Sequence, residues 1–396
     1  MKILIVNDYG TTTGGAEIMM LALRDGLRQR GHDARLFTSC AQVGTNSSLA
    51  DYKCFGTASR FRTLLQVFNP WALWRLHQVL AEFRPDVVHV SLFLTQLSPL
   101  ILPLLRDIPC LYHVHWYRPI CPLGTKLLPD GTICQFHAGM ACYRNHCLPL
   151  CDWLPLMLQM KLWQRWRSSF DLVVAVSKTV KCRLIAEGIA PVEVVWNGIP
   201  IQPSRPPLSS PPTVAFAGRL VREKGVDVLL SAFSKVVNQI PDAQLLLAGD
   251  GPERDRLNGM IASLRLFPNV THLGHLPHLD VNNHFATAWV QAIPSRWSEG
   301  LPLVAIEAMM RGTAVVGSSP GGLTEVVRDG QTGFLVPLGN ADALAEALLH
   351  LLRNRGLAEQ MGKAGREVAL AHFSEVSFID SFVQLYQMLS TSAKLH

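Results

Sequence analysis

The chain has 396 residues, of which 48% are hydrophobic and 17% charged, and its net charge is +6. These values fit a globular protein with two domains or one large one, and they exclude a disordered, collagen-like or small disulfide-stapled protein. The charge is uneven: residues 1–200 hold 20 Lys and Arg against 13 Asp and Glu, a balance of +7, whereas residues 201–396 hold 16 against 17, a balance of −1. A basic half indicates an anionic partner such as phosphate, nucleic acid or an acidic lipid surface.

The first residues, MKILIVNDYG, lack the hydrophobic region and cleavage site of a signal peptide, so a cytoplasmic location is expected. The longest apolar stretch, 87–105, is interrupted by His89, Gln96 and two prolines. A membrane-spanning helix needs about 20 mostly apolar residues, so none is expected there.

The first half of the chain alternates strands with helices. Lys2–Val6 is a continuous apolar run, typical of a strand buried on both faces, and 16–30 has the apolar spacing of a helix that ends at Gly31. Further strands are expected at 34–38, 87–90, 110–113, 172–176 and 192–195. This alternation predicts parallel βαβ units.

A segment with six prolines and three serines, 199–212, is typical of a linker. After it the alternation restarts, with strands expected at 213–217, 244–248, 270–273, 289–293, 314–317 and 333–336, and helices at 226–237 and 253–264. We therefore expect an α/β fold of two Rossmann-like doubly wound domains, 1–198 and 213–374, that face each other across a cleft. The last segment, 375–396, is predicted to be a helix that packs back on the first domain.

Ligands of open α/β sheets bind outside the carboxyl ends of the strands, so the loops after the strands are the places to look for chemistry. The loop after the first strand, NDYGTTTGGAE, lacks the G-x-G-x-x-G of dinucleotide-binding proteins. The second strand does not end in the acidic residue that would hold a ribose, which argues against a nicotinamide oxidoreductase. Gly14 and Gly15, which open the next helix, predict either an anion site or a simple turn.

The second half carries two more informative loops. In GRLVREKG, residues 218–225, Arg219 and Lys224 follow a strand and could bind a diphosphate, although a solvated basic loop would have the same composition. In SEGLP, residues 298–302, Gly300 permits a sharp turn before a helix at 303–310, whose first N–H groups could bind an anion. Glu299 and Glu307 could accept hydrogen bonds from sugar hydroxyls, and the alternative for Glu307 is a partly exposed helix residue.

In this order, these segments resemble glycosyltransferase family 4. The resemblance spans nearly the whole chain and includes GGAE at 14–17, the His115 loop, WNGIP at 196–200, FAGRLVREKG at 216–225, LLLAGDGPERDRL at 245–257, SEGLPLVAIEAM at 298–309 and PGGLTEVVRDGQTGFLV at 320–336. It implies the two-domain GT-B fold and a retaining, nucleotide-sugar-dependent transferase.

The resemblance also implies roles for individual residues. Arg219 and Lys224 would hold the donor diphosphate, Glu299 with the N–H groups of Gly300 and Leu301 would bind the transferred sugar, and Glu307 would bind the ribose. The remaining implied contacts are Gly14 and Gly15 near the diphosphate, His115 near the sugar, Asn197 at the substrate, and Gly274, His275 and Leu276 beside the base. The sequence contains no D-x-D, and the cations with a helix start could stabilise the leaving phosphate without a metal.

Five of the nine cysteines fall within 121–151: Cys121, Cys134, Cys142, Cys147 and Cys151. Such clustering in a reducing compartment favours a structural zinc site over disulfides. However, the segment has no C-x-x-C pair, so free thiols are the alternative. No cofactor is expected to be required for catalysis itself.

Two basic stretches rich in tryptophan, 60–78 and 153–169, could lie in an anionic membrane interface, or could be core helices with basic outer faces. The first interpretation predicts a peripheral membrane protein with a saccharide or lipid-linked acceptor. The competing functions are a sugar-nucleotide epimerase, a sugar phosphorylase, for which no pyridoxal lysine is evident, and a non-catalytic sugar-nucleotide-binding protein. Nucleic acid is not expected as a partner, because the basic stretches match no recognised nucleic-acid-binding module.

Overall fold

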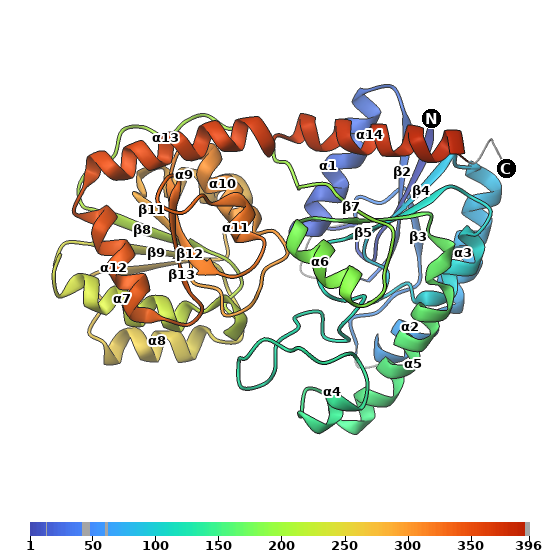
Figure 1. The fold of residues 1–396 in the computed structure, drawn as a ribbon, viewed down its shortest axis with the longest axis horizontal. Helices are drawn as coiled ribbons and strands as arrows, with labels where there is room; N and C mark the ends of the chain where they lie inside the picture. Colours follow the sequence, from blue (N-terminus) through green and yellow to red (C-terminus); the bar gives the residue numbers. More distant parts are fainter. Residues whose placement is uncertain (13, 42–47, 60–61, 393–396) are drawn as a thin grey trace. The chain divides into compact units, whose positions relative to one another are not determined.

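In the computed structural model, which describes residues 1–12, 14–41, 48–59 and 62–392, the chain forms two α/β units (Figure 1). One unit consists of Met1–Gly198 together with Glu375–His396, and the other of Ile199–Ser374. Each unit is built on its own sheet, and all strand pairs are parallel. The predicted fold class is therefore confirmed.

Within the described residues, the first unit has a seven-stranded sheet in the order β3-β2-β1-β4-β5-β6-β7. Its strands are β1 (Lys2–Val6), β2 (Asp33–Ser39), β3 (Tyr52–Cys54), β4 (Val87–Val90), β5 (Cys110–Val114), β6 (Leu172–Ala175) and β7 (Val192–Val194). Its helices are α1 (Gly15–Gln29), α2 (Arg62–Val67), α3 (Pro70–Phe83), α4 (Met140–Arg144), α5 (Leu150–Trp166), α6 (Lys178–Ala186) and α14 (Glu375–Ser392), with 3-10 turns η1 (Pro99–Leu105) and η2 (Arg167–Ser169).

The second unit has a six-stranded sheet in the order β10-β9-β8-β11-β12-β13, counted over the described residues. Its strands are β8 (Thr213–Ala217), β9 (Gln244–Ala248), β10 (Val270–Gly274), β11 (Val290–Ile293), β12 (Ala314–Ser319) and β13 (Gly333–Pro337). Its helices are α7 (Val226–Val237), α8 (Arg254–Ser263), α9 (His278–His284), α10 (Leu303–Arg311), α11 (Leu323–Val326), α12 (Ala341–Leu352) and α13 (Arg355–His372), with 3-10 turns η3 (Arg222–Lys224) and η4 (Phe285–Thr287).

Hydrophobic spacing explains these elements. The four residues from Ile3 to Val6 are fully buried, as expected for a central strand covered by helices on both faces. Helix α7 buries Leu229, Phe233 and Val236, which lie three or four residues apart and so share one face of the helix. Burial of each large side chain contributes about 1.5–3 kcal/mol, so these faces hold the helices on the sheets.

The structure adds two details to the sequence interpretation. The three-residue edge strand β3 was not anticipated, because so short a strand has too few residues to show a pattern. The basic stretch 60–78 contains two helices: α2 ends at Val67 and α3 begins at Pro70, with Asn69 as its N-cap, whose side chain accepts a hydrogen bond from the N–H of Ala72 at 3.0 Å. Residues 60 and 61 lie outside the described residues.

The proline-rich segment 199–212 packs on the second unit. Leu208 is buried in the core of that unit, and the N–H of Arg205 donates to the carbonyl oxygen of Arg311 at 2.8 Å. The indole N–H of Trp289 donates to the carbonyl oxygen of Ser209 at 2.8 Å. These contacts fix the segment along the unit that it precedes.

Helix α14 groups with the first unit, where it packs against α1 and β4. Phe378, Phe382 and Tyr386, each four residues apart, are buried along one face of the helix. Arg30, the C-cap residue of α1, forms an ion pair with Asp380 at 2.8 Å. The last segment of the chain therefore contributes to the core of the unit that contains the first residues.

Candidate active site

The sheet of the second unit changes direction between β8 and β11, which are neighbours in space but separated along the chain. Ligands of open α/β sheets bind at such a switch point, outside the carboxyl ends of the strands. The segment after β8 carries Arg219 and Lys224, and the segment after β11 carries Glu299. The topology therefore brings together two loops that the sequence had marked independently.

An ion pair joins these two loops. Nζ of Lys224 lies 2.8 Å from Oε1 of Glu299, and the hydroxyl of Ser295 donates to the same carboxylate oxygen. The Glu299 side chain is 10% exposed and that of Lys224 is 21% exposed. The lysine and the serine together compensate the burial of the carboxylate, which would otherwise be costly. Lys224 also lies over the ring of Trp297, with Nζ 5.9 Å from the ring centroid.

Arg219 occupies a different environment in the same loop. Its side chain is exposed, while the backbone beside it is closely packed: a Cβ on Gly249 would lie 1.9 Å from the carbonyl oxygen of Gly218. Gly249 also has φ +145°, a conformation that L-residues rarely adopt. A solvent-accessible side chain thus extends from a fixed backbone in the loop that also carries Lys224.

Gly300 and Leu301 are buried and lead into α10, whose N-cap is Pro302. No described side chain caps this helix start, and the N–H of Ala305 in its first turn donates to the carbonyl oxygen of Pro302 at 3.0 Å. Glu307 is buried, at 8% exposure, which rules out the exposed helix residue considered as its alternative. Burial lowers the pKa of Arg311 to about 10, and the negative charge of Glu307 opposes this shift.

Two glycines that had no assigned role pack against the segment from Glu299 to Gly300. A Cβ on Gly322 would lie 1.9 Å from the carbonyl oxygen of Gly300, and one on Gly321 would lie 2.9 Å from the nitrogen of Glu299. The N–H of Gly322 donates to the carbonyl oxygen of Glu299 at 2.8 Å. The paired glycines in the PGG segment were the available sequence signal for this close approach. Ser295 was also missed, because a single serine before a loop carries no pattern.

Gly274, His275 and Leu276 follow β10 at the edge of the same sheet. Gly274 has φ +68°, and its carbonyl oxygen accepts a hydrogen bond from the N–H of Gly249 at 2.8 Å. His275 is exposed, whereas Leu276 is half-buried against a small apolar cluster. The backbone of this segment is therefore fixed against the loop that follows β9.

In the first unit, Gly14 is the N-cap of α1, and no side chain caps that helix start. Gly15 is exposed. An exposed glycine at this position is compatible with the anion-site interpretation. Asn197 is buried, and its Oδ1 atom has no hydrogen-bond partner among the described residues.

His115 follows β5 and packs on two further histidines. The ring centroids of His115 and His113 lie 4.1 Å apart, and those of His113 and His89 lie 5.3 Å apart. Nδ1 of His89 lies 2.6 Å from the hydroxyl oxygen of Tyr386 on α14. Burial lowers the pKa of His89 and of His115 to about 3, and that of His113 falls well below its usual value, so all three rings are neutral at physiological pH. Nε2 of His115 is buried and has no hydrogen-bond partner in the part of the chain that the structure describes.

All nine cysteines are free thiols, and Cys121, Cys134, Cys142 and Cys147 are partly exposed while Cys151 is exposed. Among the residues that the structure describes, no group of three or more His, Cys, Asp and Glu side chains is arranged to hold a metal ion. The possible zinc site at these five cysteines therefore has no support among the described residues. Burial raises the pKa of Cys142, and it raises the pKa of Cys147 to about 11, with nearby cysteines adding to both shifts.

The chain has two doubly wound parallel-sheet units, and cations and carboxylates lie at a switch point of the second. This combination is typical of the GT-B class of glycosyltransferase folds. Residues 13–203 match the family described as Glycosyltransferase Family 4, and residues 199–368 match the family described as Glycosyl transferases group 1. The chain belongs to this family of retaining, nucleotide-sugar-dependent glycosyltransferases.

Similar proteins of known function include mannosyltransferases. A phosphatidyl-myo-inositol mannosyltransferase of Mycobacterium leprae is 33% identical over 57% of this chain and 62% of that protein. A GDP-mannose-dependent alpha-(1-6)-phosphatidylinositol monomannoside mannosyltransferase of Mycobacterium tuberculosis is 28% identical over 65% of this chain and 71% of that protein. The matched regions thus span about two thirds of the length of these relatives.

Solved structures share the fold over the whole chain. Sucrose-phosphate synthase from Thermosynechococcus elongatus superposes with a TM-score of 0.76 at 23% identity, covering 99% of this chain and 100% of that one. Anabaena HepE in complex with UDP-glucose has a TM-score of 0.70 at 20% identity, covering 98% of this chain and 100% of that one. At sequence identities of 20–23%, the structural similarity establishes the fold alone.

Proposed function

We propose that this protein transfers a hexose from a nucleoside-diphosphate sugar to a saccharide or lipid-linked saccharide acceptor, with retention of configuration, in polysaccharide or glycoconjugate biosynthesis. The observation that carries the proposal is the Lys224–Glu299 pair at the switch point, with Arg219 exposed in the same loop as Lys224. A cation and a carboxylate held together suit a donor that carries phosphate at one end and sugar hydroxyls at the other.

Each part of the donor would have a matching group in the second unit. Arg219 and Lys224 would bind the diphosphate, and Glu299 with the N–H groups of Gly300 and Leu301 would bind the hexose. Glu307 would accept hydrogen bonds from the ribose hydroxyls, and the backbone of 274–276 would lie beside the base. In the first unit, His115, Gly14, Gly15 and Asn197 are proposed as further substrate contacts.

The reaction would exchange one bond at the anomeric carbon for another on the same face of the sugar. The bond to the diphosphate oxygen breaks, the bond to the acceptor oxygen forms, and the acceptor proton passes to the leaving phosphate. The cations and the start of α10 would stabilise the charge that develops on that phosphate. These protein groups can supply that stabilisation themselves, so we propose that catalysis requires no divalent metal.

The first test is hydrolysis of the donor in the absence of an acceptor. Purified protein is incubated with uridine, guanosine and adenosine diphosphate hexoses in the presence of a chelator, and released nucleoside diphosphate is measured. We expect slow release from one donor, because water is a poor acceptor. Glucose and mannose donors are the first to try, since similar proteins are named for GDP-mannose or were solved with UDP-glucose.

Three other outcomes would contradict the proposal. Release that requires an added divalent metal would overturn the metal-independent step. Interconversion of donor sugars without transfer would favour an epimerase. Donor binding without turnover, even in the presence of membrane lipid extracts that contain acceptors, would favour a non-catalytic protein.

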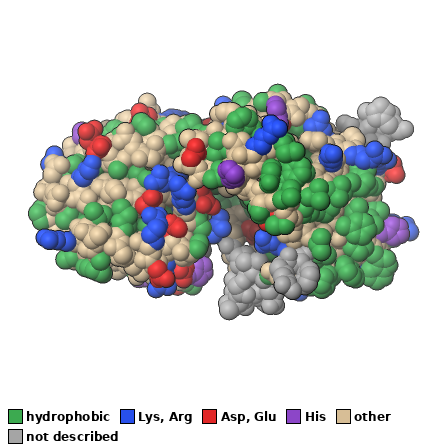
Figure 2. Space-filling model, turned by 90° about the horizontal axis from the view of Figure 1, so that it is seen from below, with side chains coloured by type: hydrophobic (Ala, Val, Ile, Leu, Met, Phe, Trp, Pro, Cys, Tyr) green, Lys and Arg blue, Asp and Glu red, His purple; other side chains and the backbone are tan. Residues whose placement is uncertain are grey.

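We further propose that the first unit docks on an anionic membrane. In the described part of the chain no helix is long and apolar enough to cross a bilayer, but α5 exposes Leu150, Leu154 and Leu158, which share one face at a spacing of four residues. Together with Leu64, Phe68, Trp71 and Trp74 of the α2–α3 region they form what we call the apolar face, with each side chain at least half exposed. Figure 2 shows hydrophobic side chains gathered over this part of the unit.

Charge beside the apolar face favours a lipid bilayer as its partner. Lys161 and Arg165 continue the leucine face of α5 over its next two turns, and both are exposed. Arg62 is exposed at the start of α2, which packs against α5. Apolar side chains flanked by cations are typical of helices that lie in the interface of an anionic membrane.

Sedimentation with phosphatidylcholine vesicles that contain phosphatidylglycerol tests the docking proposal. We expect binding that weakens at high salt, and a loss of about tenfold in the double variant L154Q/L158Q, because two apolar side chains leave the interface. Leu370→Gln, a similar change at an exposed leucine of α13, is the matched control and should sediment like the parent protein. Equal sedimentation of the double variant and the parent would contradict the proposal.

A further inference from the structure

The first unit contains a pocket at its own switch point. The sheet order changes direction between β1 and β4, and the residues that follow these strands, Tyr9 after β1 and Leu92 and Thr95 after β4, line a pocket of about 430 Å³. The buried carboxylate of Asp8 ties the two loops together, because it accepts hydrogen bonds from the N–H groups of Thr95, Gln96 and Leu97 at 2.8–2.9 Å. The pocket therefore has rigid walls at the place where such folds bind ligands.

A buried guanidinium forms part of the pocket wall. Arg118 is 6% exposed, and its Nη2 donates to Oε1 of Gln66 at 2.9 Å, to the carbonyl oxygen of Leu94 at 3.1 Å and to Oε1 of Gln159 at 3.2 Å. All three acceptors are neutral. Its Nε is buried and has no hydrogen-bond partner among the described residues.

This environment leaves the Nε–H of the guanidinium without an acceptor among the described residues. Burial lowers the pKa of Arg118 to about 10, the negative charge of Asp8 opposes this shift, and the side chain is still protonated at neutral pH. An anion bound next to the buried Nε would accept a hydrogen bond from it and offset the cost of the unpaired donor. Arg62 brings a second guanidinium to the same pocket from α2.

The rest of the lining fits a saccharide and an apolar chain. Glu17 and Asp152 supply carboxylates, Tyr9, Thr63 and Thr95 supply hydroxyls, and the Trp116 ring offers a flat apolar surface. Sugars combine hydroxyl groups that need such partners with ring faces that pack on aromatic side chains. Leu123, Leu148 and Leu156 complete the wall.

The pocket and the apolar face share two helices. Helix α2 contributes Arg62, Thr63 and Gln66 to the pocket and Leu64 to the apolar face. Helix α5 contributes Asp152 and Leu156 to the pocket and Leu154 and Leu158 to the apolar face. A ligand in the pocket would therefore lie next to the surface proposed to contact lipid.

We propose that this pocket binds the phosphate of a lipid-phosphate acceptor, with Arg118 and Arg62 on the phosphate and the lipid chain leaving along α2 and α5 toward the apolar face. The proposal rests on the transferase function in that it names the class of acceptor. It assigns Arg118 to acceptor binding, whereas Arg219 and Lys224 belong to the donor.

Binding of farnesyl diphosphate to the full-length protein, measured by calorimetry below its aggregation concentration, tests this assignment. We expect Arg118→Gln to weaken binding about tenfold to a hundredfold, because a charge-assisted contact is lost, and Arg62→Ala to weaken it about threefold to tenfold. Arg106→Gln makes the same change at an exposed arginine of this unit and should bind like the parent. Inorganic diphosphate should bind at least about tenfold more weakly than farnesyl diphosphate, since it lacks the chain.

Three results would overturn the assignment. The first is unchanged affinity in a folded Arg118→Gln protein, or in Arg62→Ala if the first variant does not fold. The second is a loss of affinity in Arg219→Ala instead, which would mean that the donor site holds the diphosphate. The third is equal affinity for inorganic diphosphate, which would mean that the lipid chain contributes nothing to binding. Donor turnover judges the transferase function separately: a protein that binds farnesyl diphosphate but releases no nucleotide, even with membrane lipid extracts, would overturn the transferase function and leave a lipid-phosphate site without an acceptor role.

Discussion

Replacing Arg219 by alanine is expected to lower kcat/KM for the donor by about a hundredfold to a thousandfold while leaving thermal stability nearly unchanged. Loss of one fixed donor to a developing negative charge typically has an effect of this size. The side chain is exposed, so its removal should leave the packing of the loop intact. Steady-state kinetics and a thermal melt of the same preparation measure the two quantities.

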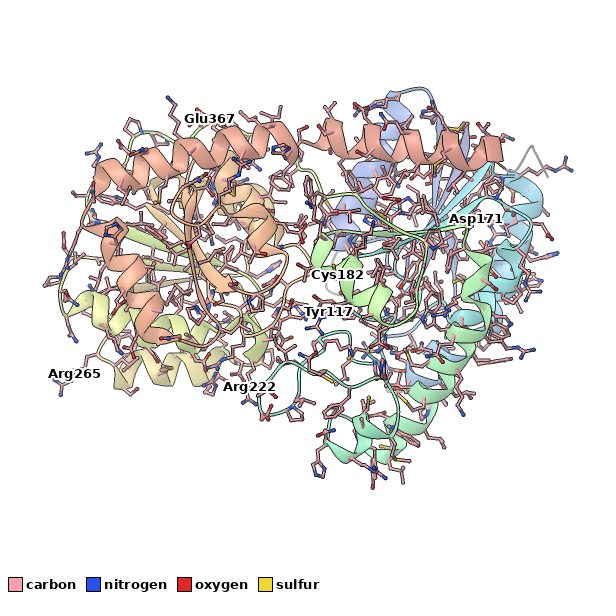
Figure 3. The ribbon with its side chains drawn as sticks, in the orientation of Figure 1. Tyr117, Asp171, Cys182, Arg222, Arg265 and Glu367 are labelled. Atoms are coloured by element: carbon pink, nitrogen blue, oxygen red, sulfur yellow. The ribbon has the colours of Figure 1, made fainter. Side chains whose placement is uncertain are left out.

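Lys224→Ala should behave differently, although the lysine lies in the same loop. It would leave Glu299 buried without its cation, so we expect a comparable loss of activity together with a loss of about 2 kcal/mol in the free energy of unfolding. Arg265, which points away from the second unit into solvent (Figure 3), is the matched control, and Arg265→Ala should keep both properties. An Arg219→Ala protein with parental kinetics would show that Arg219 has no part in binding the diphosphate.

The sequence predicted well the strands that consist of a continuous run of buried residues. The strands Lys2–Val6 and Thr213–Ala217 were expected with the bounds that the structure gives, because their continuous apolar runs leave one interpretation. By contrast, β3 has three residues and was not predicted, and neither was the division of the stretch 60–78 into two helices at Asn69. Short strands and caps depend on single residues, which carry little pattern.

The site was predictable as a set of residues but not as a set of contacts. The sequence marked Lys224 and Glu299 for different ends of the donor, and only the order of β8 and β11 in the sheet explains why they form an ion pair. Arg118 could not be identified from sequence, because its significance lies in burial among neutral acceptors from α2 and α5. Both cases depend on pairs of residues far apart in the chain, for which local spacing gives no information.

The second large loss of activity is expected when Gly322 is replaced by alanine, which adds a single methyl group. The backbone there has ordinary helical angles, φ −60° and ψ −14°, so alanine would meet no conformational strain. However, its Cβ would lie 1.9 Å from the carbonyl oxygen of Gly300 and 2.7 Å from the carbon of the same group. Real Cβ atoms do not approach a backbone so closely, and the segment from Glu299 to Leu301 would have to move.

We expect Gly322→Ala to lower kcat by about a hundredfold, because a displacement of about 1 Å in groups that position a substrate has effects of this order. Gly259 in α8 is the control: a Cβ there would meet no atom within 4 Å, so Gly259→Ala should keep full activity and gain about 0.5–1 kcal/mol in stability. Kinetics and chemical denaturation of the two variants separate displacement of the loop from a general response to alanine. Parental kcat in Gly322→Ala would mean that the position of the 299–301 backbone does not limit the reaction, and the sugar-binding role proposed for Gly300 and Leu301 would then be wrong.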